Sequence, residues 1–335
     1  MRYVLYVFIG LVITVWFGYH HYVVDGKLPE TTSYVLDMDE IRSIATAPAS
    51  DLPQYVTVTK IAENIVPVGA LVAGEGWSDA VMSRYSFQIV YPGGHVVLET
   101  GMTQEQSTFF DRGTYFAEAF EPMMTAMETA DLIISTHEHL DHIGALAVHP
   151  NLRLLADKAL VTRDQLAWAE ILHGVAFPEW FMAEYVPLEF DNYYRAAPGL
   201  VLIKAAGHTP GSLMAFVSFA DGSEALFVGD IVFAMANITR QTARPRFVSH
   251  FIVKEDRPAV LDQVRALVDL HEREPNLNFV VSHDGAQIEA YMLHGWMKSP
   301  RPSHFGSGSQ GYSVLEGHSF LDYSGMSSIA VHRQR

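Results

Sequence analysis

The chain has 335 residues with a formal net charge of −16, and 49% of them are hydrophobic while only 18% are charged. This composition supplies a sizeable core and argues against wholesale disorder, and the acidic balance disfavours general nucleic-acid binding because phosphate backbones would be repelled. The absence of cysteine excludes disulfides, thiolate nucleophiles and cysteine-ligated metal sites, so the 16 histidines and the carboxylates would have to hold any metal ion.

The first segment is typical of a membrane signal. Residues 3–18 carry no charge, and extending the run to residue 24 gives the roughly 20 residues needed to cross a bilayer. Arg2 lies on the flank expected to stay in the cytoplasm. We therefore predict that residues 1–24 are a single-pass membrane anchor with the rest of the chain outside the cytoplasm, in the periplasm if the source is bacterial. The alternatives are a signal peptide that is cleaved to give a secreted protein and a buried core helix.

Three further segments follow. Residues 25–53 are predicted to be a connector, residues 54–298 a folded domain, and residues 299–335, which are rich in Ser, Gly and Pro, a loosely ordered tail. Within the domain, helices are predicted at 116–129 and at 257–272, the latter capped by Asp256. Strands are predicted at 54–59, 87–91, 95–99, 132–135, 200–205, 213–219, 224–228 and 278–282, with hairpin turns at 92–94 and 221–222. This mixture predicts a layered α/β fold.

A cluster of possible metal ligands directly follows the apolar strand at 132–135. The segment 137–142 reads His-Glu-His-Leu-Asp-His, so it offers four ligands within six residues: His137, His139, Asp141 and His142. In extended backbone the first two project to the same side. The last two fall where the chain turns into a helix predicted to begin near residue 143, so they point in different directions. That arrangement can serve two neighbouring metal ions.

Three more candidate ligands each follow a later strand. His208 lies in the sequence Gly-His-Thr-Pro-Gly at 207–211, Asp230 follows a glycine after the strand at 224–228, and His283 stands in Ser-His-Asp after the strand at 278–282. Loops at strand ends are where α/β proteins place their chemistry. The other histidines, among them His149, are expected to be ordinary surface or core residues.

These motifs, in this order over roughly residues 87–297, resemble those of the metallo-β-lactamase-fold hydrolase superfamily. The resemblance implies an αββα sandwich, in which two mixed sheets lie face to face with helices outside and a di-metal site at one edge. It implies that His137, His139 and His208 hold a first ion and that Asp141, His142 and His283 hold a second, with Asp230 bridging both. Two Zn²⁺ ions are expected, with Fe or Mn as alternatives.

One residue departs from the family pattern. At the end of the early strand the family usually has an aspartate that supports the site, whereas this chain has Glu99 in Glu-Thr-Gly. Because glutamate is one methylene longer, either the backbone shifts or the support is weaker. The departure concerns metal affinity rather than the identity of the ligands.

The resemblance implies a hydrolase in which a hydroxide bridging two metal ions attacks an ester-like carbonyl, with Asp141 or Asp230 passing a proton to the leaving group. The expected substrate is a small acyl-bearing molecule, most specifically a lactone of the N-acyl-homoserine-lactone type. Thioesterase and phosphodiesterase activities are the alternatives within hydrolases. A non-catalytic binding protein and a single-iron dioxygenase are the alternatives from other classes. No nucleic-acid partner is expected, and the sequence leaves the oligomeric state open.

An aromatic stretch at 168–194 precedes the strand that leads to His208. By analogy with the lactonase branch it could cover an acyl chain, and the alternative is that it packs as core or against the membrane surface. Tyr193 or Tyr194 could donate a hydrogen bond to the substrate carbonyl, and no motif decides between them.

Overall fold

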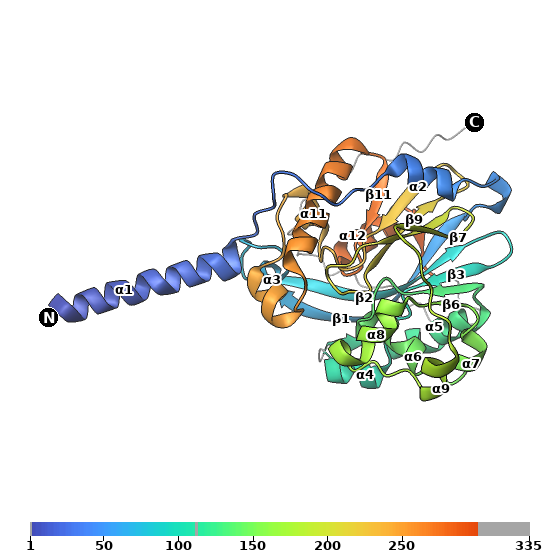
Figure 1. Cartoon of the computed structure of the whole chain (residues 1–335), viewed down its shortest axis with the longest axis horizontal. Coiled ribbons are helices and arrows are strands. Elements are labelled where there is room, and N and C mark those ends of the chain that lie inside the picture. The colour runs from blue at the N-terminus through green and yellow to red at the C-terminus, as the bar shows by residue number, and fades with distance from the viewer. Residues whose placement is uncertain (1, 111–112, 301–335) are drawn as a thin grey trace.

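Two mixed β-sheets lie face to face at the centre of the computed structural model, which describes residues 2–110 and 113–300 (Figure 1). The first sheet has the strand order β12-β1-β2-β3-β5-β6, with β4 paired to β1. Its strands are β1 (Tyr55–Pro67), β2 (Asp79–Val90), β3 (His95–Leu98), β4 (Thr114–Tyr115), β5 (Leu132–Ile134), β6 (Ala159–Leu160) and β12 (Met297–Lys298). The predicted tail lies, from residue 301 onward, outside the described residues.

The second sheet has the order β11-β10-β9-β8-β7. Its strands are β7 (Tyr193–Ala197), β8 (Leu200–Lys204), β9 (Leu213–Ser218), β10 (Glu224–Phe227) and β11 (Leu277–Val280). Both predicted hairpins are present. The turn between β9 and β10 contains Gly222 with φ of 85°, a backbone conformation that favours glycine.

Helices other than the N-terminal one cover the sheets. In chain order, the helices are α1 (Arg2–Tyr19), α2 (Met38–Ala45), α3 (Val68–Leu71), α4 (Gln104–Phe110), α5 (Ala117–Thr129), α6 (Leu140–Ala147), α7 (Leu152–Leu155), α8 (Arg163–His173), α9 (Glu179–Glu184), α10 (Met235–Thr239), α11 (Arg257–Arg273) and α12 (Gly285–Leu293), with short helical turns η1 (His20–Val24), η2 (Ala49–Asp51) and η3 (Val248–Ile252). As predicted, Asp256 caps α11, where its side chain accepts a hydrogen bond from Ala259 N.

Three apolar layers hold these elements together. Between the sheets, side chains from both pack against one another, among them Phe87 and Phe227 with ring centroids 5.3 Å apart. A second layer joins the outer face of the second sheet to α11 and α2, and a third joins the first sheet to α5, α6 and α8. The result is a mixed α/β fold of the αββα arrangement, because each sheet buries one face on its partner and the other under helices.

Residues 25–53 pack onto the domain. Leu36, Met38, Ile41 and Ala45 are buried in the same apolar layer as α11, and α2 lies over the second sheet. Arg42 of α2 donates hydrogen bonds to Glu224 and Glu274. The segment predicted as a connector therefore forms part of the helical layer, because its apolar residues recur at helical spacing.

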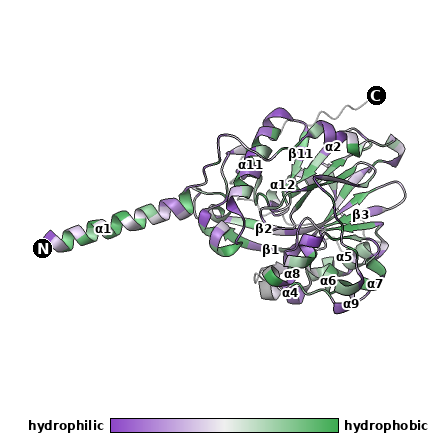
Figure 2. Cartoon of the chain, in the orientation of Figure 1, coloured by the Kyte–Doolittle hydropathy of each residue, from purple (hydrophilic) through white to green (hydrophobic). Residues whose placement is uncertain are grey.

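The N-terminal helix stands apart from the domain. Residues 2–24 form α1 and η1, an apolar helix with no buried residue that extends away from the sheets (Figure 1). Figure 2 shows apolar residues along most of its length. By length and composition it could cross a membrane or serve as a signal sequence.

The strand directions bring five loops to one edge of the sandwich. In the first sheet β3 and β5 are parallel. In the second, β8 and β10 are both antiparallel to β9 and so run in the same direction, and β11 is parallel to β10. The carboxyl ends of these five strands precede Glu99, the segment 135–142, His208, Asp230 and His283, respectively.

Candidate metal centre

The loop after β5 carries the first four candidate ligands. It runs from Ser135 to His139, and α6 then begins at Leu140 with His139 as its N-cap residue. The helix thus begins three residues earlier than predicted, and Asp141 and His142 lie in its first turn. All residues of α6 are buried, so the loop and the helix are fixed by core packing.

The other three ligands enter from the second sheet. His208, Asp230 and His283 follow β8, β10 and β11 after short turns, and all three are buried. At the turn before Asp230, Gly229 has φ of 55°, and a Cβ there would lie 3.0 Å from Thr136 Oγ1. The close approach of two loops from different sheets therefore favours glycine at this position.

The structure brings all seven predicted ligands together in two groups. His137, His139, His208 and Asp230 each offer an atom within 4.8 Å of the others, and Asp141, His142 and His283 form a second such group. Asp230 also lies near the second group, with its Oδ2 3.0 Å from His283 Nε2 and its Oδ1 3.5 Å from His142 Nε2. It therefore occupies the position between the two groups.

For three of the five imidazoles, contacts at the outer ring nitrogen define which nitrogen faces the cluster. His283 Nδ1 donates to the carbonyl of Ser83 at 2.7 Å. His208 Nδ1 donates to Glu255 Oε2 at 3.2 Å. A neutral imidazole carries only one N–H, so the Nε2 atoms of both residues present lone pairs to the cluster. Glu99 Oε1, which lies 3.2 Å from His142 Nδ1, favours the same tautomer for His142.

Lone pairs that converge in this way suit a cation. His139 Nδ1 lies 2.8 Å from His137 Nε2 and 3.0 Å from His208 Nε2, and the Nε2 atoms of His142 and His283 are 3.3 Å apart. Two nitrogens on a tetrahedral zinc ion are about 3.3 Å apart. Asp230 Oδ1 is buried and has no hydrogen-bond donor among the described residues. An imidazole and carboxylate set of this kind fits divalent transition metals such as zinc.

The electrostatic environment acts differently on the individual groups. Burial would lower the pKa of His142, but the carboxylates of Glu99, Asp230 and Asp141 outweigh it and raise that pKa to about 10, so a metal ion would have to displace its proton. Burial, reinforced by the neighbouring His142, holds the pKa of His137 well below its usual value. Burial alone would raise the pKa of Asp230, but the imidazoles of His283, His142 and His137 outweigh it and lower that pKa. Neutral imidazoles and an ionised carboxylate are the forms that bind metal ions.

Glu99 contacts the metal centre from a left-handed backbone conformation. Its carboxylate accepts hydrogen bonds from Thr136 N at 3.1 Å and from Thr136 Oγ1 at 2.5 Å, and it also faces His142. Its φ of 69° places it in the left-handed region, which is uncommon for a residue other than glycine. Glu99 thus contacts both the ligand loop and His142 from a left-handed backbone position.

Glu255 is a supporting residue that the motifs did not reveal. Its side chain is fully buried, and Oε2 lies 3.1 Å from Arg244 Nη2 as well as 3.2 Å from His208. Although burial would raise the pKa of Glu255, Arg244 and His208 lower it, so the carboxylate is ionised. Arg244 also donates to the carbonyl oxygens of Asp230 and Ile231. The pair therefore orients ligands from two different loops.

Arg84 was also missed, and it places a cation beside the second group. Its Nε donates to Asp141 Oδ2 at 3.2 Å, and both side chains are buried. Arg84 lies in β2, far in sequence from every motif, and only an apolar strand pattern surrounds it. No sequence signal could have linked it to Asp141.

Glu138, between two ligands, joins the loops instead of facing the cluster. Its carboxylate accepts hydrogen bonds from Thr209 Oγ1 at 2.7 Å and Gly211 N at 3.1 Å. Burial raises the pKa of Glu138 to about 7. The loop 207–211 is thereby tied to the loop that follows β5.

The aromatic stretch at 168–194 packs mainly as core. Phe177, Phe181 and Tyr185 stack in series within the layer below the first sheet. The Tyr193 hydroxyl contacts the backbone of Asp37 and Val35, and Tyr194 packs near Phe190, so the contacts of both tyrosines lie away from the ligands.

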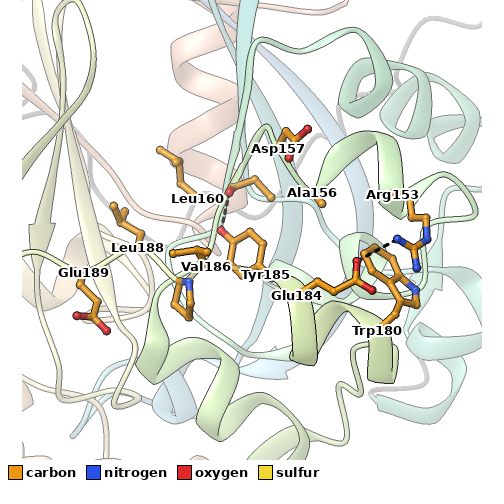
Figure 3. A pocket seen from close by; sticks show the side chains of 12 residues that line it. Arg153, Ala156, Asp157, Leu160, Trp180, Glu184, Tyr185, Val186, Leu188 and Glu189 are labelled. Atoms are coloured by element: carbon orange, nitrogen blue, oxygen red, sulfur yellow. Dashed lines mark hydrogen bonds and ion pairs between the residues drawn. The ribbon is translucent and has the colours of Figure 1, made fainter.

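A cavity of about 550 Å³ opens at this stretch (Figure 3). Trp180, Tyr185 and Val186 line it, and Arg153 lies over the Trp180 ring while pairing with Glu184. None of the seven ligands lines this cavity, so we do not assign it to the metal centre.

Comparisons with known proteins agree with this geometry. The sequence profile of the Metallo-beta-lactamase superfamily matches residues 81–273. No curated protein matches the sequence. A solved N-acyl homoserine lactone hydrolase, with N-hexanoyl-L-homoserine bound at its catalytic metal center, aligns with a TM-score of 0.55 and 15% identity over 71% of this chain and 96% of its own.

Two further solved structures give the same result. AiiA from B. thuringiensis, with N-decanoyl-L-homoserine at its active site, aligns with a TM-score of 0.55 and 15% identity over 71% of this chain and 96% of its own. A quorum-quenching N-acyl homoserine lactone lactonase aligns with a TM-score of 0.55 and 16% identity over 72% and 96%, respectively. Because the sequence identities are only 15–16%, these structural similarities show a shared fold and nothing more.

Proposed function

The chain belongs to the metallo-beta-lactamase superfamily, and from this premise we propose that it is a di-zinc hydrolase of an ester-like bond, most specifically an acyl lactone. One observation carries the proposal. Imidazoles from the three loops that follow β5, β8 and β11 converge around the buried Asp230 carboxylate, which follows β10, at one edge of the sandwich. A protein that had lost catalysis would have little reason to keep these costly buried polar groups together.

Each residue has a proposed role. The first ion would be held by His137, His139 and His208, and the second by Asp141, His142 and His283, with Asp230 between them. When bound, two zinc ions supply an activated water at neutral pH and a counter-charge for the developing oxyanion. Glu99 and Glu255 orient the imidazoles from outside.

Proton transfer is assigned to the two aspartates. Asp230 lies between the two ligand groups, where its carboxylate is near both proposed ions. Asp141 is held in place by Arg84, beside the second group. These carboxylates are the proposed route for a proton to the leaving oxygen.

The acyl-lactone class is supported by the likeness in fold to solved lactone hydrolases. The test is a hydrolysis panel with acyl lactones, thioesters, phosphodiesters and a β-lactam, run beside metal quantification. We expect two zinc ions per chain and the highest kcat/KM for a lactone. A preference for a thioester or phosphodiester would assign a different substrate class. If the metal-loaded protein hydrolyses none of these compounds, the proposal that it is a hydrolase is rejected.

We also propose that α1 anchors the chain in a membrane, with the catalytic domain of residues 54–298 and the packed segment 25–53 outside the cytoplasm. The fully exposed apolar surface of α1 supports this, because such a surface would be unfavourable in water. The test is the N-terminal sequence of the mature protein together with alkaline extraction of membranes. An intact N-terminus in the extracted pellet is expected, whereas a soluble product lacking α1 would identify a cleaved signal.

A further inference from the structure

The helix that ends at Val24 is joined to the domain without a flexible linker. Gly74 N donates to the carbonyl of Val23 at 3.2 Å, and Ala243 N donates to that of Gly26 at 2.9 Å. A Cβ on Gly26 would lie only 2.6 Å from the Cβ of Ala73, so the chain passes through a closely packed site. The direction of α1 therefore fixes which face of the domain is turned toward a membrane that α1 enters.

That face carries exposed apolar side chains next to the helix end. Tyr22 and Phe251 have ring centroids 5.7 Å apart, and Phe251 and Phe247 have centroids 5.5 Å apart. With Ile252 these residues form what we call the junction patch, whose members are between 37% and 63% exposed. Large apolar side chains that gather in this way mark a surface that contacts something other than water.

Basic residues accompany the junction patch although the whole chain is strongly acidic. Of the five arginine and lysine residues in 240–257, Arg244 and Arg257 are buried and Arg240 pairs with Glu75. The exposed Lys254 and the half-buried Arg246, which lies 4.0 Å from Asp25, flank η3. Aromatic and basic side chains side by side are typical of surfaces that lie in the headgroup region of a bilayer.

An apolar layer leads from the junction patch to the metal centre. Val248 and Val253, on either side of the patch aromatics, pack against a cluster that includes Phe233. The Phe233 ring lies 5.9 Å from the His208 ring and 5.7 Å from the His283 ring. The Phe233 side of the metal centre is thus the side connected to the membrane-proximal surface.

We propose that the junction patch lies in the headgroup region of the bilayer that α1 enters, and that the metal centre consequently acts on an amphiphilic acyl substrate that partitions into this membrane. The substrate class rests on the hydrolase proposed above, and the lipid contact rests on the anchor. The continuity of the patch with α1 argues for lipid rather than for a protein partner as its occupant.

The lipid contact can be tested without reference to activity. Because the chain has no cysteine, Ile252→Cys can carry a single polarity-sensitive fluorophore in the full chain, reconstituted in nanodiscs. The matched control is Ile171→Cys, because Ile171 is 73% exposed and belongs to α8, which Figure 1 shows away from the end of α1. Lipids with a quencher on the headgroup should quench the label at 252 several-fold more than the label at 171.

Each other outcome overturns the lipid contact. Equal quenching at both positions would mean that the junction patch faces water. A label at 252 that is shielded from water but not quenched by lipid would mean that a protein partner or a second copy of the chain covers the patch. If the full chain does not enter nanodiscs, both the proposed membrane anchor and the proposed lipid contact are rejected.

A second experiment tests the substrate class. Two lactones are compared in nanodiscs, one with a short acyl chain that stays in water and one with a long chain that partitions into lipid. In the double variant Phe247→Ser/Ile252→Ser, the ratio of long-chain to short-chain kcat/KM should fall about tenfold, and in Ile171→Ser it should not change. An unchanged ratio in the double variant rejects the membrane-drawn substrate. If the unmodified protein hydrolyses neither lactone, the lactonase proposal is rejected. The fluorescence experiment then still tests the lipid contact independently.

Discussion

Glu255 Oε2 lies 3.2 Å from His208 Nδ1, on the side of the imidazole opposite to the nitrogen that faces His139 and Asp230. A fully buried carboxylate in this position fixes both the tautomer and the rotation of the ring. Its own partner, Arg244, keeps it ionised and also contacts the loop that carries Asp230.

The first prediction concerns this contact. Glu255→Ala should weaken zinc retention about tenfold to hundredfold, because His208 loses the group that orients it. Glu255→Gln should recover part of the loss, since its amide oxygen can still accept the Nδ1 hydrogen. Chelator competition measures both, and Glu184→Gln, at an exposed ion pair, is the control. If Glu255→Ala retains zinc as well as the unmodified chain, Glu255 does not support the metal centre.

The second prediction concerns the carboxylate between the two ligand groups. Asp230→Asn keeps the size of the side chain but removes its charge, so one of the two ions should be lost together with most of the turnover. Elemental analysis and kcat measure the two effects, and Asp221→Asn, in the exposed turn between β9 and β10, is the control. Full occupancy with near-normal turnover would rule out a bridging role.

The third prediction concerns the residue that departs from the family pattern. Glu99→Asp should lower zinc affinity about tenfold, because the shorter side chain on this left-handed backbone would no longer reach both Thr136 and His142. Isothermal titration of the metal-free protein measures the change, with the exposed Glu105→Asp as control. A higher zinc affinity in Glu99→Asp would mean that the glutamate weakens metal binding instead of supporting it.

The fourth prediction concerns the order of metal binding. Arg84 lies beside Asp141, whereas Arg244, a buried cation near His208, is neutralised by Glu255. The group that contains His137 should therefore fill first and the group that contains Asp141 second, with lower affinity. Titration with Co²⁺ followed by absorbance should show two steps, and Arg84→Gln should bring them closer together, unlike the exposed Arg153→Gln. A single step in the unmodified chain would contradict this asymmetry.

The fifth prediction concerns pH and a histidine outside the metal centre. Burial lowers the pKa of His149, and its Nδ1 accepts a hydrogen bond from Asn151 N at 3.0 Å, which requires a neutral ring. As the pH falls below about 6.5, the unfolded chain takes up a proton at this residue before the folded chain does, so stability is lost toward acid. Urea unfolding between pH 8 and pH 5 should show a smaller loss for His149→Gln than for the unmodified chain. If the stabilities of the two proteins fall equally with decreasing pH, His149 does not contribute to the loss of stability in acid.

The convergence of the seven candidate ligands was predictable because each of them stands in a local motif after an apolar strand. His137 and His283 are recognisable from their immediate neighbours, and the strand directions then bring them to one edge. The turn between β9 and β10 and the cap of α11 were predictable for the same reason, since a few adjacent residues determine them.

The missed residues depend on contacts between distant parts of the chain. Arg84 is surrounded in sequence by strand residues, and Glu255 by surface residues, so only the folded chain shows that each is buried against a ligand. The same is true of residues 25–53, whose turn-rich beginning suggested a connector. Their short helix, α2, has a cap at Asp37 and an apolar face, but it owes its stability mainly to the sheet that it covers.

The pairing of β12 with β1 has a consequence for how the protein is made. Met297 lies beside Val56 in parallel, so the sheet that begins with the first long strand is completed by residues near the end of the described chain. Residues 297–298 must therefore be synthesised before this edge strand can pair, and such long-range pairing forms slowly.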